Sequence, residues 1–336
     1  MGSPAYATVE QVARAADVQF TAYQTATLSR AAFSTSRAIE RRLHRHFYPL
    51  TEAVSFKNPP VSNPDRVATS GFWLNKDLLT LTALTEDSTA VTVSGVELYP
   101  VEYGPPYSWL GATGVDVVVT GTWGWSADTE AAGVLDGALS DTTGTVAKVK
   151  DASLVGVGDL ILVDSEQMLI TAKLMVDTTV DTTSNPTADM SDTTVAVADG
   201  SLFGVGEVLL LGSERMLIVD IATNNLIVRR AFDGTVLAAH STPSIFALRT
   251  LTVERGAVGT TAATHSDAAT ITRNVPPGPI TDLCIAEALN LMEQESSAYA
   301  RTVGSSDNQR EARGVALAQA RKAVDTYRRL RMMATR

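Results

Sequence analysis

The spacing of hydrophobic residues divides the chain into a helical beginning, a long strand-rich middle and a helical end. Ile39, Leu43 and Phe47 recur every four residues and predict one apolar face of a helix, which Pro49 ends. Thr8 and Gln11 stand three residues apart, as a capping box requires at the start of an earlier helix. From about residue 67 hydrophobic and polar residues alternate, which predicts strands that bury one face.

Helical periodicity returns after the proline-rich stretch 276–279. The segments 280–301 and 311–331 predict two amphipathic helices joined by a short polar linker. The last helix has one apolar face, made by Leu317, Ala320, Val324 and Tyr327. Its arginines, Arg328, Arg329 and Arg331, suit the negative C-terminal end of a helix dipole.

Two passages of the middle region are copies of one another. Residues 151–170 and 199–218 agree at 12 of 20 positions, and each predicts two strands joined by a tight turn. A Gly-Val-Gly before each pair of strands predicts a sharp bend. A second passage begins at Leu226 and returns at Leu251 in the same register.

The order of these copies predicts that one unit lies inside the other. A tandem duplication would alternate the two passages, whereas here each passage is followed by its own copy. We therefore expect three units: a parent domain of residues 1–127 plus 274–336, an outer β module of 141–181 plus 251–273, and an inner β module of 191–249. Residues 177–190 are expected to be the linker between the two modules. The competing interpretation is one continuous barrel in which both copies share a single sheet.

Composition restricts the class of protein. The chain has 336 residues, which is enough for two or three domains. Its single cysteine, Cys284, excludes an internal disulfide, and we expect it to be a buried apolar residue. No apolar run approaches the roughly 18 residues of a membrane span, and the first residues lack the pattern of a signal peptide. We expect synthesis in a reducing cytoplasm and no membrane partner.

The negative charge is concentrated in the repeated region. Residues 128–273 hold 9 basic and 19 acidic side chains, a balance of −10 that equals the net charge of the whole chain. Such a surface repels the phosphate backbone, so sequence-specific binding of nucleic acid is not expected. DNA can still pass close by without being held.

Residues with catalytic chemistry occur as repeated pairs and not as a catalytic set. Glu166 and Glu214 are the same position in two copies, and so are His240 and His265. Serines follow both histidines, but no G-x-S-x-G sequence accompanies them, so we expect the histidines to fix turns and all four residues to be repeated structural positions. Trp123 and Trp125 predict either core packing or a stacking surface. We expect no catalytic, cofactor-binding or metal-binding residue, and no cofactor.

Several segments outside the repeats resemble the head–tail connector (adaptor, or head-completion) proteins of long-tailed bacteriophages. The resemblance rests on the order of these patterns: SRAIERRLHRHFYP, DLLTLTALT, YPVEYGPPYSWL, VDVVVTGTWGWSA, VPPGPITDLCIAEALNLMEQESSAYAR and AQARKAVDTYRRLR. It covers about residues 1–127 and 274–336. The long insert between them is a departure from that family, although the inserted repeats look like a module of phage structural proteins.

The resemblance implies a structural virion protein at the neck of the particle and no enzyme. Family members form a ring, usually of twelve copies, beneath the portal protein, and DNA passes through the channel of the ring. The implied partners are the portal protein, a downstream head-closure (stopper) or tail-completion protein, and other copies of the chain. The C-terminal helix implies a portal-docking surface, made here by Val315, Leu317, Val324, Tyr327, Arg328, Arg329 and Arg331.

The expected fold class is therefore α+β: a helical connector domain with antiparallel strands, interrupted by two nested, small, barrel-like all-β modules. The alternative function is a phage receptor- or glycan-binding structural protein, in which the β modules are adhesive and the helices form a mount. The terminal helices favour the connector, because an adhesin has little need of them.

Overall fold

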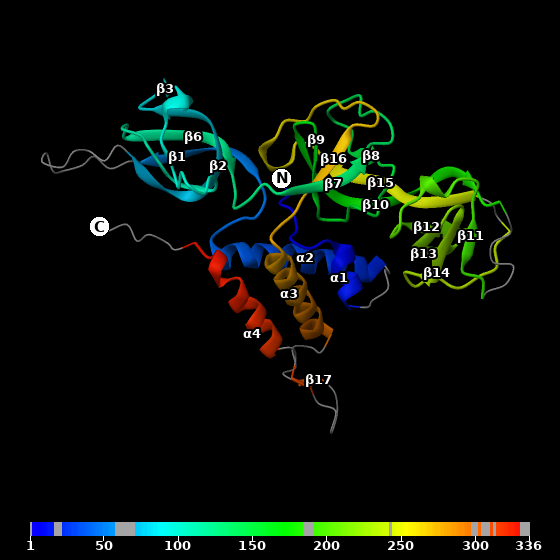
Figure 1. Ribbon diagram of the computed structural model, residues 1–336. Helices are drawn as coiled ribbons and strands as arrows, with labels where there is room; N and C mark the ends of the chain where they lie inside the picture. The colour runs from blue at the N-terminus through cyan, green and yellow to red at the C-terminus, as the bar shows by residue number, and fades with distance from the viewer. Residues whose placement is uncertain are drawn as a thin grey trace, which may run out of the picture.

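The structure is a computed structural model that shows a layer of helices with β-structure mounted on it (Figure 1). It describes residues 2–16, 22–57, 71–183, 191–241, 244–296, 302–303, 310–311 and 314–329.

Helices from both halves of the chain form one helical layer. Its members are α1 (Val9–Ala16), α2 (Ala22–Leu43), α3 (Gly278–Ser296) and α4 (Gly314–Ala323), with a 3-10 turn at Asp325–Tyr327. The capping box is confirmed: the Thr8 amide donates to Gln11 Oε1 at 2.8 Å and the Gln11 amide donates to Thr8 Oγ1 at 3.1 Å. A short pair, β17 (Thr302–Val303) and β18 (Arg310–Glu311), stands where the sequence predicted only a linker.

The predicted helical stripe lies in the core, but the helix ends sooner than expected. Ile39, Leu43 and Phe47 are all buried. The helix stops at Leu43 because His44 adopts a left-handed backbone conformation, with φ of 55°. The last predicted helix is also shorter, since α4 ends at Ala323.

Residues 50–57 and 71–123 form a separate antiparallel sheet, here called the first sheet. Its strands are β1 (Leu50–Lys57), β2 (Phe72–Glu86), β3 (Thr89–Val91), β4 (Leu98–Tyr99), β5 (Tyr107–Leu110) and β6 (Asp116–Trp123), with a 3-10 turn at Val93–Gly95. The strand order is β1-β6-β2-β5-β4, and β3 pairs with β2. The first sheet has its own apolar core around Leu78, Leu84 and Trp123, which is distinct from the core of the helices.

The repeated region forms a ten-stranded antiparallel sheet. Its strands are β7 (Thr129–Val134), β8 (Val146–Lys148), β9 (Leu160–Val163), β10 (Glu166–Asp181), β11 (Thr194–Ala196), β12 (Val208–Leu211), β13 (Glu214–Ala222), β14 (Asn225–Phe232), β15 (Ser244–Glu254) and β16 (Thr270–Asn274); 3-10 turns lie at Gly200–Leu202 and Ala257–Gly259. The order is β11-β14-β13-β12-β15-β10-β9-β16-β7, and β8 pairs with β15.

This sheet closes on itself twice and makes two barrels. In the outer barrel (residues 129–174 and 250–274), the bridge between Leu135 and Val149 joins β7 to the end of β8, which pairs with β15. In the inner barrel (residues 175–182 and 191–249), the bridge between Thr182 and Val197 joins the end of β10 to β11. The long strands β10 and β15 run through both barrels, so each is shared.

The two barrels have separate cores built from equivalent residues. Eight core residues of the outer barrel have counterparts in the core of the inner one: Ala147 and Val195, Val149 and Val197, Ile161 and Leu209, Val163 and Leu211, Met168 and Met216, Ile170 and Ile218, Leu251 and Leu226, Val253 and Val228. Because these side chains point inward in both copies, one pattern of alternation suffices to specify both barrels.

The pairing of residues 251–254 shows where the inner barrel enters the outer one. Residues 250–252 pair with 148–146 and residues 254–250 pair with 169–174, whereas the inner strand β14 pairs with β11 and β13. Leu174 faces Thr250 across β10 and β15, as Ala222 faces Asn225 across the β13–β14 turn. The inner barrel therefore occupies the place of a two-residue turn. The domain boundaries drawn from the sequence stay a prediction.

The predicted fold class is wrong. Strands make up 42% of the structure and helices 23%, so the protein is mostly antiparallel sheet and not a helical connector domain with small inserts. The expectation failed because the first sheet builds its own core instead of covering the helices. Residues 177–181, expected in a linker, belong to β10, because they pair with the start of β15.

Candidate functional site

The outer barrel holds a buried cluster around Glu166, whose side chain is 0% exposed. Its carboxylate accepts two hydrogen bonds from the Arg255 guanidinium, both at 2.8 Å, and bonds from the backbone amides of Gly256 and Ala263. His265 Nε2 lies 2.9 Å from the same carboxylate. Arg255 also donates to the carbonyls of Asp141 and Gly144, so the cluster ties four loops together.

The inner barrel repeats this cluster around Glu214. Arg230 donates to both carboxylate oxygens at 2.9 and 2.8 Å, the amides of Ala231 and Ala238 donate as well, and His240 Nε2 lies at 2.7 Å. One difference separates the copies. His265 Nδ1 contacts Asp164 at 2.8 Å, whereas Gly212 stands at the position equivalent to Asp164.

These clusters stabilise the barrels and have no room for a substrate. Burial alone would raise the pKa of each glutamate, but the arginine, the histidine and the two amides hold the pKa of Glu166 and of Glu214 at about 2. A carboxylate with such a low pKa and every oxygen engaged is a poor general acid or base. The hydrogen bonds of Glu166, Glu214, His240 and His265 join the turns of each barrel.

Stability is expected to depend on pH through these two glutamates. The pKa of each is lowered from its ordinary 4.5 to about 2 in the folded protein, so the stabilisation is complete above pH 4.5 and is lost as the pH falls toward 2. The midpoint of thermal unfolding should be level near neutral pH and should drop between about pH 4.5 and 2. A midpoint that stays level down to pH 2.5 would contradict this role.

Other candidate residues have ordinary structural roles. His46 Nε2 lies 3.0 Å from the Trp123 carbonyl, and Cys284 is buried beside Thr35 and Ser36, where burial raises the pKa of its thiol. Within the described ranges, no three His, Cys, Asp or Glu side chains are placed to hold a metal ion. None of the described helices is long and apolar enough to cross a membrane.

The predicted portal-docking residues are mostly engaged inside the chain itself. Leu317 and Val324 are buried in the core of the helical layer, and the Tyr327 ring makes edge contacts with the rings of Phe47 and Trp125. Arg329 donates to the buried Asp77 at 2.7 Å. Arg328 is exposed. The Val315 side chain and Arg331 lie outside the described residues.

The tryptophans named from the sequence do not form an exposed surface, whereas another row of aromatic residues is partly exposed. Trp123 is fully buried, and Trp125 lies under the Arg45 guanidinium. On the first sheet, Trp73, Trp109 and Tyr99 pair across β2, β5 and β4, with Trp73 58% and Tyr99 47% exposed. Sequence reasoning missed this row because the register between the strands decides it.

The outer barrel is docked on the helical layer through the predicted Gly-Val-Gly bend. The Ala5 amide donates to the Gly158 carbonyl and the Val9 amide to the Val157 carbonyl, both at 3.0 Å. Gly158 needs its lack of a side chain, because its φ is 103° and a Cβ would lie 2.9 Å from the Ala5 Cβ. Leu160 also joins the core of the helices.

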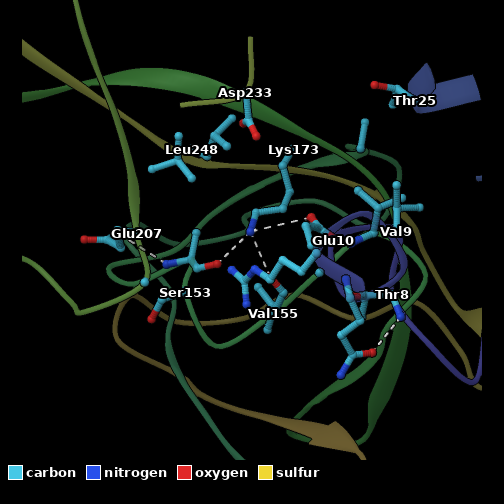
Figure 2. A pocket seen from close by; sticks show the side chains of 18 of the residues that line it. Thr8, Val9, Glu10, Thr25, Ser153, Val155, Lys173, Glu207, Asp233 and Leu248 are labelled. Atoms are coloured by element: carbon cyan, nitrogen blue, oxygen red, sulfur yellow. Dashed lines mark hydrogen bonds and ion pairs between the residues drawn. The ribbon is translucent and has the colours of Figure 1, made fainter. Parts of the chain in front are cut away.

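A cleft of about 860 Å³ opens where α1, the outer barrel and the inner barrel meet (Figure 2). Lys173 lies at its centre, with its side chain 10% exposed, and donates to the carbonyls of Ala152 and Val155 at 2.7 and 2.8 Å. Its ammonium is 3.8 Å from Glu10 of α1. Burial lowers the pKa of Lys173, and Glu10 opposes that shift. Asp233 of the inner barrel also lines the cleft and is paired with Arg215 at 3.2 Å.

The comparisons with known proteins identify no relative. No protein-family model, no curated protein and no solved structure matches the chain. Function therefore has to be argued from the residues and their arrangement.

Proposed function

We propose that this protein is a structural virion protein, a head–tail connector or adaptor that forms a ring, docks on the portal protein and joins the DNA-filled capsid to the tail. Its partners in this proposal are the portal protein, other copies of the chain, and a head-closure or tail-completion protein. DNA passes through the ring without sequence-specific contacts. The protein assembles in the host cytoplasm and ends at the neck of the virion.

One observation carries the proposal. Three segments that resemble the connector family lie far apart in the sequence and meet in one core. They contribute Ile39, Leu43 and Phe47 from the first segment, Ile280, Leu283, Cys284 and Ala288 from the second, and Val324 from the third. Segments that occur in a given order by chance have no reason to share a core, so their packing together supports treating them as parts of one domain.

The portal contact in this proposal has to use what the helical layer leaves exposed. Leu317 and Val324 are buried in the chain, so among the described members of the predicted docking set Arg328 is the one with an exposed side chain that can meet an acidic portal surface. If docking also uses the apolar side chains, α4 has to leave its place in the helical layer first.

A map of the virion by electron cryomicroscopy tests the proposal. We expect this chain as a closed ring of about twelve copies at the portal vertex, with neighbours in head-to-tail contact. Density for the chain only at the tail tip would overturn the proposal and support the receptor- or glycan-binding alternative, for which the row of Trp73, Trp109 and Tyr99 would be the first surface to test.

A further inference from the structure

One surface of the inner barrel forms a wall of the cleft and is open. The corresponding surface of the outer barrel is covered by the helical layer. In the outer barrel, Leu160, Ala257 and Val258 pack against the helical layer. The equivalent residues of the inner barrel are Val208, Phe232 and Asp233, and all three line the cleft. The inner barrel thus turns the same face toward α1, but a gap separates the two.

Two substitutions between the copies add charge to this face, while Val208 and Phe232 keep part of it apolar. Asp233 replaces Val258, and Arg215 replaces Gln167. The two new side chains form an ion pair, in which the Asp233 side chain is only 6% exposed. A face that packed on a helix would keep its apolar residues, so these changes suit contact with a polar, charged partner.

The carboxylates of the cleft are already neutralised, while some of its cations keep free donors. Glu10 accepts from the Val157 amide at 2.8 Å, and Glu207 accepts two bonds from Arg249. By contrast, Arg14 on α1 is exposed, and no described residue accepts a hydrogen bond from its guanidinium. Among the same residues, the Arg215 guanidinium donates through Nη1 alone, to Asp233, and its Nε and Nη2 are left for a ligand.

We propose that this cleft binds an acidic peptide segment of a partner protein, whose carboxylates bridge Arg14 of α1 and Arg215 of the inner barrel. Arginine is well suited to this contact, because its planar guanidinium donates two parallel hydrogen bonds to a carboxylate. A flexible peptide can enter a cleft that lies between two barrels. A DNA duplex is wider and stiffer than a single peptide strand, which favours the peptide.

Binding at this place fixes the position of the inner barrel. The two barrels share the strands β10 and β15, but their apolar cores are separate. β10 and β15 change register between Leu174 and Val176, at the junction of the barrels. A peptide held by both Arg14 and Arg215 would tie the inner barrel to the helical layer across this junction.

The experiment uses the full chain and a fluorescently labelled hexaglutamate peptide, with fluorescence anisotropy as the measurement. Binding is expected at low salt, with affinity that falls as salt rises. Arg14→Ser should weaken it at least tenfold, and Arg14→Lys should weaken it less. Arg41→Ser removes the same charge from an exposed position of α2 and serves as the matched control, with little change expected.

Three results would overturn the proposal. The first is no binding of the peptide at low salt, and the second is equal weakening by Arg14→Ser and Arg41→Ser. The third is that inorganic phosphate or a short DNA duplex competes as well as unlabelled hexaglutamate at the same ionic strength, because the cleft would then select anions in general. Amide hydrogen exchange of the Arg14→Ser variant checks that α1 is still folded.

Discussion

Glu166→Gln is expected to unfold the outer barrel or to destabilise it by about 3–5 kcal/mol, because it leaves the buried Arg255 guanidinium without its counter-charge. The amides of Gly256 and Ala263 also lose a charged acceptor. Hydrogen exchange measured by mass spectrometry, peptide by peptide, should show faster exchange in β8, β9 and β16.

The second copy supplies the control for this prediction. Glu214→Gln makes the same change around Arg230 and should accelerate exchange in β11, β13 and β14 while it leaves β16 protected. Glu102→Gln changes an exposed glutamate of the first sheet and should alter neither barrel. Two results would show that the Glu166 cluster does not specifically stabilise the outer barrel. One is a loss of stability below about 0.5 kcal/mol in Glu166→Gln, and the other is an equal increase of hydrogen exchange in both barrels.

Removal of the whole inner barrel is expected to leave the outer barrel folded. The variant deletes residues 175–249 and joins Leu174 to Thr250 through Asn-Gly, which copies the turn between Ala222 and Asn225 of the inner barrel. The apolar core of the outer barrel includes no residue from the deleted part. The carbonyl of the new glycine can accept from the Val149 amide, as the Arg249 carbonyl does now and as the Asn224 carbonyl does for Val197.

Circular dichroism, thermal unfolding and hydrogen exchange are the measurements for this variant. A loss of about 1–3 kcal/mol is acceptable, since one packing partner has gone. A comparison variant that deletes residues 187–250 keeps residues 175–181 of β10 without their β15 partners and should be less stable. An unfolded outer barrel in the first variant would show that the two barrels form a single cooperative unit.

The sequence predicted the repeats well because repetition is visible without any knowledge of distance. The equivalence of Glu166 with Glu214 and of His240 with His265 follows from the register of the copies, and the buried clusters have the same geometry. The capping box at Thr8 could be predicted equally well, since all its atoms lie within one turn. The cleft could not be predicted in this way, because α1 and both barrels each contribute one part of it.

The errors have one physical cause. An apolar face shows that a helix or strand is covered, but not what covers it. Leu317 and Val324, which belong to the predicted docking surface, lie in the same apolar core as Phe47 within the chain itself. The strands of residues 50–123 were assigned to a helical domain and instead cover one another. The local sequence pattern does not distinguish between these packing partners, because only long-range contacts determine which surface covers an apolar face.

The pairing of Leu174 with Thr250 has a consequence for the growth of such a protein. The chain leaves the outer barrel and re-enters it at two residues that face each other on neighbouring strands, about 5 Å apart. An insertion between such residues moves neither of them, so the outer barrel is expected to tolerate inserts of different lengths. The β13–β14 turn at Thr223 is the equivalent insertion point of the inner barrel. A third barrel inserted at this turn would extend the β-structure by one more unit. No residue of the helical layer would have to change.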